Sequence, residues 1–261
     1  MAQGFEGRRV VITGGAGGIG QAIAQRFLAA GASVVLGDVD EAALERARIA
    51  LGPDPGIVRC DVEREADCRR LIEASESLLS GPVDVFVAHA GVPFSGTLAD
   101  CPADEIRRVI SVNVIGSILS AQAALASLRR GTDPCLLFMG SLQSLSGRAA
   151  RSVYTASKHA IAGLVKSLAL ELGPDGIRVN ALAPTVVDTP FLHEAYRRVG
   201  LAVEQGLSDA ARALPLGRIP TVEDVAETAL FLCSPAARAI TGQIVPVDCG
   251  ALAGRFDPPK R

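Results

Sequence analysis

The chain has 261 residues, enough for one large α/β domain or two small ones, and its 49% hydrophobic and 21% charged composition is that of an ordinary globular protein. Its formal net charge of −2 gives no reason to expect binding to nucleic acid or to an anionic membrane surface. It shows no amino-terminal signal pattern and no uninterrupted apolar run near the ~20 residues that cross a bilayer. The six cysteines form no CxxC pair, which indicates reduced thiols, no metal site and a cytoplasmic location.

Short β-branched runs alternate with helical segments along the whole chain. We expect strands at 9–13, 33–37, 56–60, 83–88, 135–139, 177–182 and 243–247. Between them, helical periodicity predicts helices near 19–30, 41–51, 64–79, 103–128, 152–172 and 221–233. This alternation predicts an α/β fold with a doubly wound, seven-stranded parallel sheet and helices on both faces.

One stretch has a weak pattern and no predicted strand. It is the segment 190–213, within a longer insertion at about 188–216 near the carboxyl-terminal edge of the predicted sheet. A substrate lid or loop is expected at this place.

A glycine-rich turn, "TGGAGGIG", separates the first predicted strand from the first helix. Its pattern is Thr13-Gly14-x-x-x-Gly18-x-Gly20 rather than GxGxxG. Glycines here let the backbone approach a pyrophosphate at the positive end of the helix dipole. The alternative is a tight turn that binds no ligand.

Asp38 ends the second predicted strand, where a carboxylate can accept hydrogen bonds from the adenosine ribose hydroxyls. Neither the glycine turn nor Val39 offers a lysine or arginine for a 2′-phosphate, so NAD is favoured over NADP. Asp38 could also cap the next helix. Asp61, at the end of the third strand, either faces the adenine or is a plain helix N-cap.

Tyr154 and Lys158 are four residues apart in a predicted helix and therefore lie on one helix face. A free tyrosine has a pKa of ~10 and is a poor acid–base catalyst near neutrality. A nearby cation favours the phenolate, so we expect Lys158 to lower the pKa of Tyr154.

Two further polar positions flank this pair. Three serines, 141, 144 and 146, follow the fifth predicted strand, and any of their hydroxyls could donate to a substrate oxygen. Asn113 falls on an otherwise apolar helix stripe. It is either a structural asparagine bonded to a backbone carbonyl or a water anchor in a proton path.

Taken together, these motifs resemble those of the short-chain dehydrogenase/reductase family from about residue 5 to residue 252. The family's TGxxxGxG matches Thr13 to Gly20, its YxxxK matches Tyr154 to Lys158, and its active-site serine matches Ser141. Its helical asparagine matches Asn113. The resemblance implies a single Rossmann-type domain over residues 1–261, usually assembled as a homotetramer, with a dimer as the fallback.

The resemblance also implies the catalytic and cofactor-binding residues. Tyr154 exchanges a proton with the substrate, Lys158 assists it and holds the nicotinamide ribose, Ser141 holds the substrate oxygen, and Asn113 orders a water. The implied cofactor-binding residues are Gly14, Gly18, Ile19, Gly20, Asp38, Asp61, Val62, Ala90, Gly91, Tyr154, Lys158, Pro184, Val187 and Thr189.

Three positions depart from the family pattern. His89 replaces an asparagine in "AHAG", and we interpret it as structural. Thr185 stands at a glycine position beside the nicotinamide, so the geometry on the substrate side can differ. Cys249 replaces a glycine in "VDCG", which we interpret as a packing change.

The implied function is hydride transfer between NAD(H) and a secondary alcohol or ketone. Polar residues at 193 and 196–198 and Gln143 hint at a polyol, sugar or hydroxy acid, although the former could simply decorate the outside of a lid. An NADPH-dependent 3-oxoacyl reductase is the first alternative. A non-catalytic nucleotide-binding protein is less favoured, because all four catalytic positions are filled.

Overall fold

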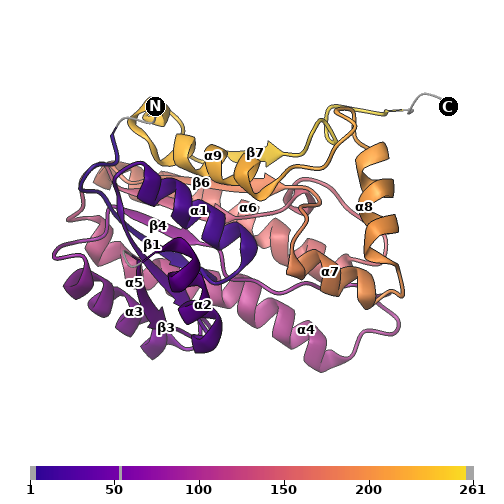
Figure 1. The fold of residues 1–261 in the computed structure, drawn as a ribbon, viewed down its shortest axis with the longest axis horizontal. Helices are drawn as coiled ribbons and strands as arrows, with labels where there is room; N and C mark the ends of the chain where they lie inside the picture. The colour runs from indigo at the N-terminus through magenta and orange to yellow at the C-terminus, as the bar shows by residue number, and fades with distance from the viewer. Residues whose placement is uncertain (1–3, 53–54, 257–261) are drawn as a thin grey trace.

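The computed structural model describes residues 4–52 and 55–256. Residues 1–3 and 257–261 of the predicted 1–261 domain therefore lie outside the described residues. The chain folds around one parallel sheet with strand order β3-β2-β1-β4-β5-β6-β7 (Figure 1). The strands are Arg9–Thr13 (β1), Ser33–Asp38 (β2), Gly56–Arg59 (β3), Val85–Ala88 (β4), Cys135–Met139 (β5), Arg178–Pro184 (β6) and Ile244–Val247 (β7).

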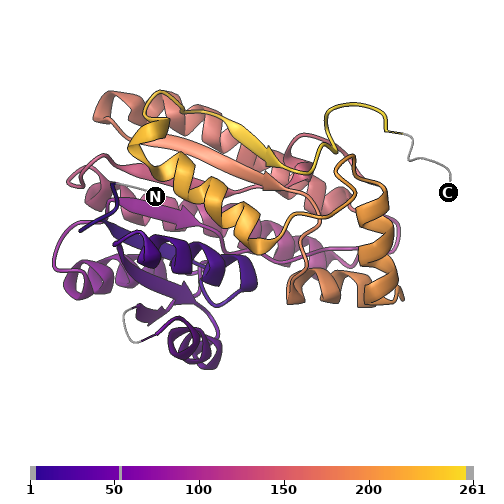
Figure 2. The ribbon, with the colours of Figure 1, turned by 45° about the horizontal axis from the view of Figure 1, so that its top comes forward.

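Helices cover both faces of this sheet (Figures 1 and 2). They are Gly18–Ala29 (α1), Glu41–Leu51 (α2), Glu65–Leu78 (α3), Ala103–Ile110 (α4), Ser117–Leu128 (α5), Ser152–Leu172 (α6), Pro190–Arg197 (α7), Val203–Arg212 (α8) and Val222–Cys233 (α9). The doubly wound architecture and all seven strands are those that the sequence predicts.

Successive residues of each strand face opposite cores. Val10 and Ile12 of β1 pack with Phe27 of α1 in one fully buried cluster, which also includes residues of α2 and α9. Val11 belongs to the opposite cluster, together with Leu128 of α5 and side chains of α3 and α6. The strands are uninterrupted apolar runs because both of their faces are buried.

The predicted helix 103–128 is continuous but not uniform. Its middle, Ser111–Gly116, is a π-helical turn that separates α4 from α5. By length and hydropathy this helix is the one span among the described residues that could cross a bilayer. Here, however, Ala121, Ala124 and Leu128 pack into the core against the sheet.

The segment 190–213, for which the sequence pattern was weak, contains two helices, α7 and α8. The start of α7 carries a signal that we did not use: Thr189 is the N-cap and accepts a hydrogen bond from Leu192 N, and Pro190 opens the helix. Helix α7 buries Ala195 and Tyr196. In Figures 1 and 2 the two helices project beyond the carboxyl ends of the strands.

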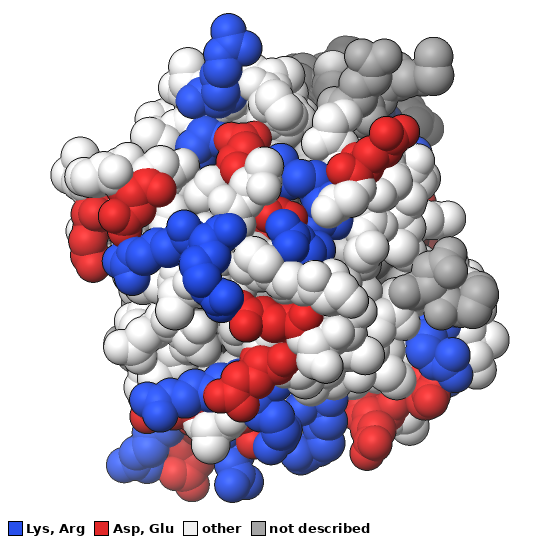
Figure 3. Space-filling model, turned by 90° about the vertical axis from the view of Figure 1, so that its left-hand side faces the viewer, with Lys and Arg blue, Asp and Glu red and all other residues white. Residues whose placement is uncertain are grey.

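Charges of both signs are mixed on the one face of the molecule that Figure 3 shows. On the face shown in Figure 3, at the opposite end of the sheet from α7 and α8, basic side chains lie beside acidic ones. Among the described residues, several arginines form ion pairs within one helix, such as Arg48 with Glu45 on α2.

Cys249 occupies a backbone conformation that favours glycine. Its φ is 52°, in the turn after β7, so the replacement has a backbone consequence besides the packing change that we expected. A non-glycine residue in this left-handed region costs roughly 1–2 kcal/mol.

Replacing Cys249 with glycine should therefore stabilise the protein. We expect C249G to raise the free energy of unfolding by about 0.5–1 kcal/mol, part of the relieved strain being offset by the added freedom of the unfolded chain. Urea denaturation measures this change. Cys101, another half-buried thiol, is not among the residues with positive φ. C101G should lower the free energy of unfolding. An equal loss in C249G would contradict the inference that the backbone is strained at Cys249.

Candidate active site

A cavity of about 540 Å³ opens at the carboxyl ends of the central strands. At one end it is lined by Gly14, which follows β1, and by Asp38, which ends β2. At the other end it is lined by Ser141, which follows β5, and by Tyr154 on α6. The order of the strands reverses between β1 and β4 at this edge, and ligands of doubly wound sheets bind at such a point.

The glycine turn forms one end of the cavity. Gly14 has φ of 66°, and a Cβ there would lie 2.8 Å from Ala90 Cα and 2.9 Å from His89 Nδ1. A Cβ at Gly20 would lie 2.5 Å from Gly14 O. A side chain at position 14 would therefore push the turn away from the end of β4, and a side chain at position 20 would push α1 away from the turn. Gly14, Gly18 and Ile19 line the cavity, whereas Gly20 does not and instead allows α1 to pack against the turn.

The amino terminus of α1 faces this end without a side-chain cap. Its N-cap is Gly17, which makes no side-chain capping bond, and its first turn contains no acidic residue. Backbone N–H groups at a helix start carry a partial positive charge and favour an anion. This part of the cavity fits the pyrophosphate of a dinucleotide.

Asp38 lies beside the glycine turn and lines the cavity. Its Oδ2 accepts a hydrogen bond from Ala16 N at 3.2 Å, and its Oδ1 accepts one from Asp40 N at 3.2 Å. The cap of α2 is Asp40, which accepts from Ala43 N at 2.9 Å. The capping alternative for Asp38 is therefore wrong, and its carboxylate is held at the wall of the cavity.

Asp61 and Val62 do not line this cavity, so the adenine contact predicted for Asp61 and the cofactor contact predicted for Val62 stay predictions. Asp61 Oδ1 accepts a hydrogen bond from Glu63 N at 3.1 Å and so closes the turn that leads to α3. The N-cap of α3 is Arg64, so Asp61 is not a plain N-cap. Val62 is buried against Gly116, where a Cβ would lie 2.6 Å from Val62 Cγ2.

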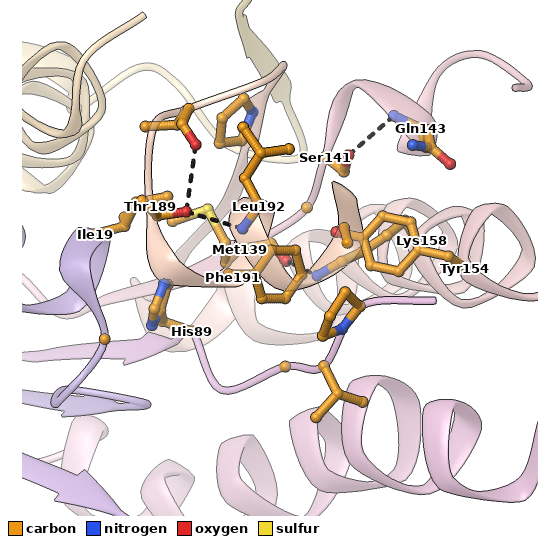
Figure 4. A pocket seen from close by; sticks show the side chains of 18 of the residues that line it. Ile19, His89, Met139, Ser141, Gln143, Tyr154, Lys158, Thr189, Phe191 and Leu192 are labelled. Carbon is orange, nitrogen blue, oxygen red and sulfur yellow. Dashed lines mark hydrogen bonds between the residues drawn. The ribbon is translucent and has the colours of Figure 1, made fainter. Parts of the chain in front are cut away.

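Tyr154 and Lys158 lie together on α6 (Figure 4), and both are almost fully buried. Lys158 Nζ is 5.7 Å from the centre of the Tyr154 ring and donates to Met139 O at 2.8 Å. Burial lowers the pKa of Lys158 to about 8. The chain thus holds a cation that loses its proton easily next to the tyrosine.

The expected lowering of the tyrosine pKa is not seen in this structure. Burial raises the pKa of Tyr154 to about 12, and a hydrogen bond with Ser141 and the charge of Arg151 offset only part of that shift. Lys158 does not contribute, since its ammonium group is directed to Met139 O. Tyr154 is therefore a neutral proton donor in the chain by itself.

Ser141 is the serine that lies beside Tyr154. It is the N-cap of the short turn Leu142–Ser144, and its Oγ accepts from Gln143 N at 3.2 Å. Ser144 is buried, and its Oγ accepts from Ser141 N at 3.2 Å. Ser146 lines the cavity but bonds back to Leu142 O. Ser144 therefore orients the residue whose hydroxyl meets the tyrosine.

Asn113 lies below the cavity floor, fully buried in the π-helical turn. Its Oδ1 accepts from Val92 N at 2.8 Å, and its Nδ2 donates to Val92 O at 3.1 Å and to Ser157 Oγ at 3.2 Å. These bonds are those of a structural asparagine bonded to a backbone carbonyl, one of the two interpretations that the sequence left open. It fixes the segment after β4 to α6, while its role as a water anchor stays a prediction.

Five more of the predicted cofactor-binding residues line the middle of the cavity: Ala90, Gly91, Pro184, Val187 and Thr189. Thr189 Oγ1 donates to Val187 O at 3.3 Å, which closes the turn between β6 and α7 (Figure 4).

Two of the departures from the family pattern lie in the same wall. His89 Nδ1 lies 3.1 Å from Gly14 O, so the ring holds the glycine turn against β4. Burial and the charge of Lys158 lower the pKa of His89 to about 4, which keeps the ring neutral. Thr185 lines the cavity, and its N donates to Val247 O at 3.2 Å.

The polar residues of 190–213 do not line the cavity. His193 bonds Asp188 at 2.6 Å, Tyr196 donates its hydroxyl to Gly206 O, and Arg198 pairs with Glu194. The wall instead receives the apolar side chains of Pro190, Phe191, Leu192 and Ala195. Figure 4 shows Phe191 between His89 on one side and Tyr154 on the other.

Two arginines of the lining were missed from the sequence. Arg148 and Arg151 reach the cavity from the loop between Ser141 and α6. The signal was present in "SGRAAR", a pair of basic residues placed between two predicted catalytic positions.

The comparisons with known proteins agree with this geometry. Residues 14–251 match a family model described as "Enoyl-(Acyl carrier protein) reductase". The chain belongs to the short-chain dehydrogenase/reductase family. It is 36% identical to cis-4-hydroxycyclohexanecarboxylate dehydrogenase of Sinomonas cyclohexanicum, over 97% of this chain and 100% of the relative.

Two other similar proteins are named for related activities. The chain is 32% identical to 2,5-dichloro-2,5-cyclohexadiene-1,4-diol dehydrogenase of Sphingobium indicum, over 95% of this chain and 98% of the relative. A 3-ketoacyl-(acyl-carrier-protein) reductase from Brucella melitensis, solved with NADH, superposes with a TM-score of 0.86 at 32% identity, over 95% and 99% of the two chains. The protein is therefore an oxidoreductase that acts on CH–OH groups or ketones, and a nicotinamide cofactor is expected for it.

The buried Lys158 predicts a pH dependence of stability. Its pKa is about 8 in the folded protein against an ordinary value of 10.5, so the unfolded chain binds more protons between these pH values. The contribution of Lys158 to the free energy of unfolding should rise with pH over this window, by on the order of 3 kcal/mol in full.

Urea denaturation from about pH 7.5 to about pH 9.5 tests this, a range that ends before most of the unfolded tyrosines ionise. The free energy of unfolding of wild type minus that of K158M should increase with pH, because the variant has no amine to deprotonate. Lys166, exposed on the same helix, supplies the control K166M, which should keep the wild-type slope. A K158M profile parallel to wild type would contradict the buried charge.

Proposed function

We propose that the protein is an NAD(H)-dependent dehydrogenase that interconverts a secondary alcohol and its ketone. The observation that carries this proposal is the position of Asp38 at one end of the cavity and of Tyr154, Ser141 and Lys158 at the other. A carboxylate beside the glycine turn suits the adenosine ribose hydroxyls of NAD and repels a 2′-phosphate. The lysine and arginines that line the cavity all belong to the tyrosine end.

The nicotinamide cofactor supplies the hydride acceptor for oxidation and the donor for reduction. The chain's own residues manage the oxygen and the proton. Ser141 holds the substrate oxygen. In reduction, neutral Tyr154 donates its proton to that oxygen as the carbonyl becomes a carbinol, and in oxidation Tyr154 takes the hydroxyl proton after losing its own. Lys158 lies within reach to assist Tyr154, because burial has already weakened its hold on its own proton.

The wall of the cavity supports a substrate with a largely apolar body. Phe191, Leu192 and Val92 line it, and the Phe191 and Tyr154 ring centres are 6.3 Å apart. The two curated relatives are named for alcohols on six-membered carbon rings. Among the polyols, sugars and hydroxy acids expected from the sequence, this lining favours a hydroxylated ring or alkyl chain over a fully polar polyol.

A second candidate is the reduction of 3-oxoacyl groups. It is supported by the similarity to the Brucella melitensis 3-ketoacyl-(acyl-carrier-protein) reductase, which was solved with NADH. We further propose a cytoplasmic homotetramer. All six cysteines are free thiols, which is compatible with a reducing compartment.

The role of Asp38 predicts the cofactor preference. NADH should bind wild type at least about tenfold tighter than NADPH, a preference of ~1.4 kcal/mol. In D38N the carboxylate charge is gone, so the preference should fall. Titration of both cofactors by nicotinamide fluorescence measures it. E41Q, in the first turn of α2, removes a charge outside the cavity and should keep the preference. Tighter NADPH binding by wild type would overturn the NAD assignment.

The role of Tyr154 predicts its effect on turnover. Y154F should bind the reduced cofactor within about twofold of wild type and lose roughly 10²–10⁴-fold in kcat, because the group that exchanges the proton with the substrate is missing. Oxidation of a panel of secondary alcohols and hydroxy acids measures kcat.

The chain's other tyrosine is the matched control. Tyr196 is also buried, and its hydroxyl is bonded to Gly206 O, away from the cavity lining. Y196F should keep kcat within a few-fold. Equal loss in both variants, or retained turnover in Y154F, would exclude Tyr154 as the proton donor.

A further inference from the structure

Arg148 and Arg151 bring two positive charges to the substrate end of the cavity. Arg151 is half-buried just before α6, and its Nη1 donates to Phe94 O at 2.8 Å. Arg148 is exposed three residues earlier in the same loop. Both belong to the same wall as Tyr154.

Within the described part of the chain, no carboxylate forms an ion pair with either arginine. Most exposed arginines here do have such a partner, for example Arg107 with Asp104 and Arg198 with Glu194. The two cavity arginines also repel each other, and burial together with the charge of Arg148 lowers the pKa of Arg151. The cavity therefore has an uncompensated positive end.

The loop that carries the arginines is held in place. Ala150 between them has φ of 58°, a strained conformation for alanine, and its carbonyl oxygen accepts a hydrogen bond from Gly96 N at 2.9 Å. Strain of this kind persists where the surroundings fix it, often at binding sites. The hydrogen bond from the Arg151 guanidinium to Phe94 O connects this loop to the same neighbouring segment.

Gln143 adds a neutral donor to this end. Its Oε1 accepts from Thr155 Oγ1 at 2.8 Å, and its Nε2 has no partner among the residues that the structure describes. One amide and two guanidinium groups therefore line the cavity, which also receives apolar side chains of α7.

We propose that the substrate is a hydroxy acid whose carboxylate binds Arg148 and Arg151 while its carbinol lies at Ser141 and Tyr154. This inference rests on the proposed dehydrogenase function and adds the charge of the substrate to it. A planar guanidinium matches a carboxylate with two parallel hydrogen bonds, and the ligand's charge relieves the repulsion between the arginines. The carboxylate itself takes no part in the oxidation.

A pair of probes that differ only in charge tests this directly. The dissociation constants of cyclohexanecarboxylate and of neutral cyclohexanecarboxamide are measured by calorimetry on the protein saturated with the reduced cofactor that it binds more tightly. Wild type should bind the carboxylate about tenfold or more tightly than the amide, the effect of one or more hydrogen bonds to a charged group. R148Q should lose most of this preference, and R148K should retain part of it.

R238Q is the matched control. Arg238 is exposed after α9, outside the cavity lining, and forms no ion pair with a carboxylate of the described residues. R238Q loses the same charge as R148Q and should keep the wild-type preference. If the amide binds as tightly as the carboxylate in wild type, or if R238Q and R148Q change the preference equally, the proposal is overturned.

Kinetics separate this inference from the proposed function. 4-Hydroxycyclohexanecarboxylate and its carboxamide are offered as substrates, and the R148Q effect should fall on KM for the acid and leave kcat nearly unchanged. Carboxylate binding that depends on Arg148, without oxidation of either alcohol, would support the anion site while contradicting the dehydrogenase assignment. Oxidation of both alcohols at equal kcat/KM would support the dehydrogenase and overturn the anion site.

Discussion

The site depends on how closely the turn after β1 approaches the end of β4. At Gly14 there is no room for a side chain, because Ala90 Cα and His89 Nδ1 occupy the place of a Cβ. The contact between His89 and Gly14 O fastens the same two segments. The close approach leaves the start of α1 facing the cavity, so the backbone rather than a side chain forms the anion-binding end.

The same approach also explains how a histidine can replace the usual asparagine. The ring is held neutral by burial and by the charge of Lys158, so Nδ1 can donate to a carbonyl oxygen at any ordinary pH. An asparagine would donate from an amide that never titrates. The substitution therefore preserves the donor at this position, and it changes the size and shape of the side chain beside the cofactor cavity more than its hydrogen bonding.

The sequence predicted the sheet, its strands and the grouping of the catalytic side chains because these follow from periodicity and from motif spacing. It did not predict the packing-dependent properties. The pKa of Tyr154 depends on its burial and on Lys158 turning to Met139 O, neither of which is encoded by the spacing of four. Nor did the sequence show that Asp61 accepts a hydrogen bond from Glu63 N, which depends on the direction of the turn after β3. Helices α7 and α8 were missed although both are amphipathic, because they have only 8 and 10 residues and so show each repeat of the pattern only two or three times.

The two cavity arginines are a second case in which the sequence did not reveal a property that depends on the fold. In the sequence, Arg148 and Arg151 are two basic residues of a loop, and such residues are usually solvated. Only the folded chain shows that they face the cavity while the carboxylates of the nearby helices are bonded elsewhere, Glu105 with Arg108 and Asp209 with Arg212. The cavity consequently has an acidic end at Asp38 and a basic end at Arg148 and Arg151, with the tyrosine next to the latter. The positive charge beside the tyrosine attracts the carboxylate of a hydroxy acid toward the catalytic residues before any specific contact forms.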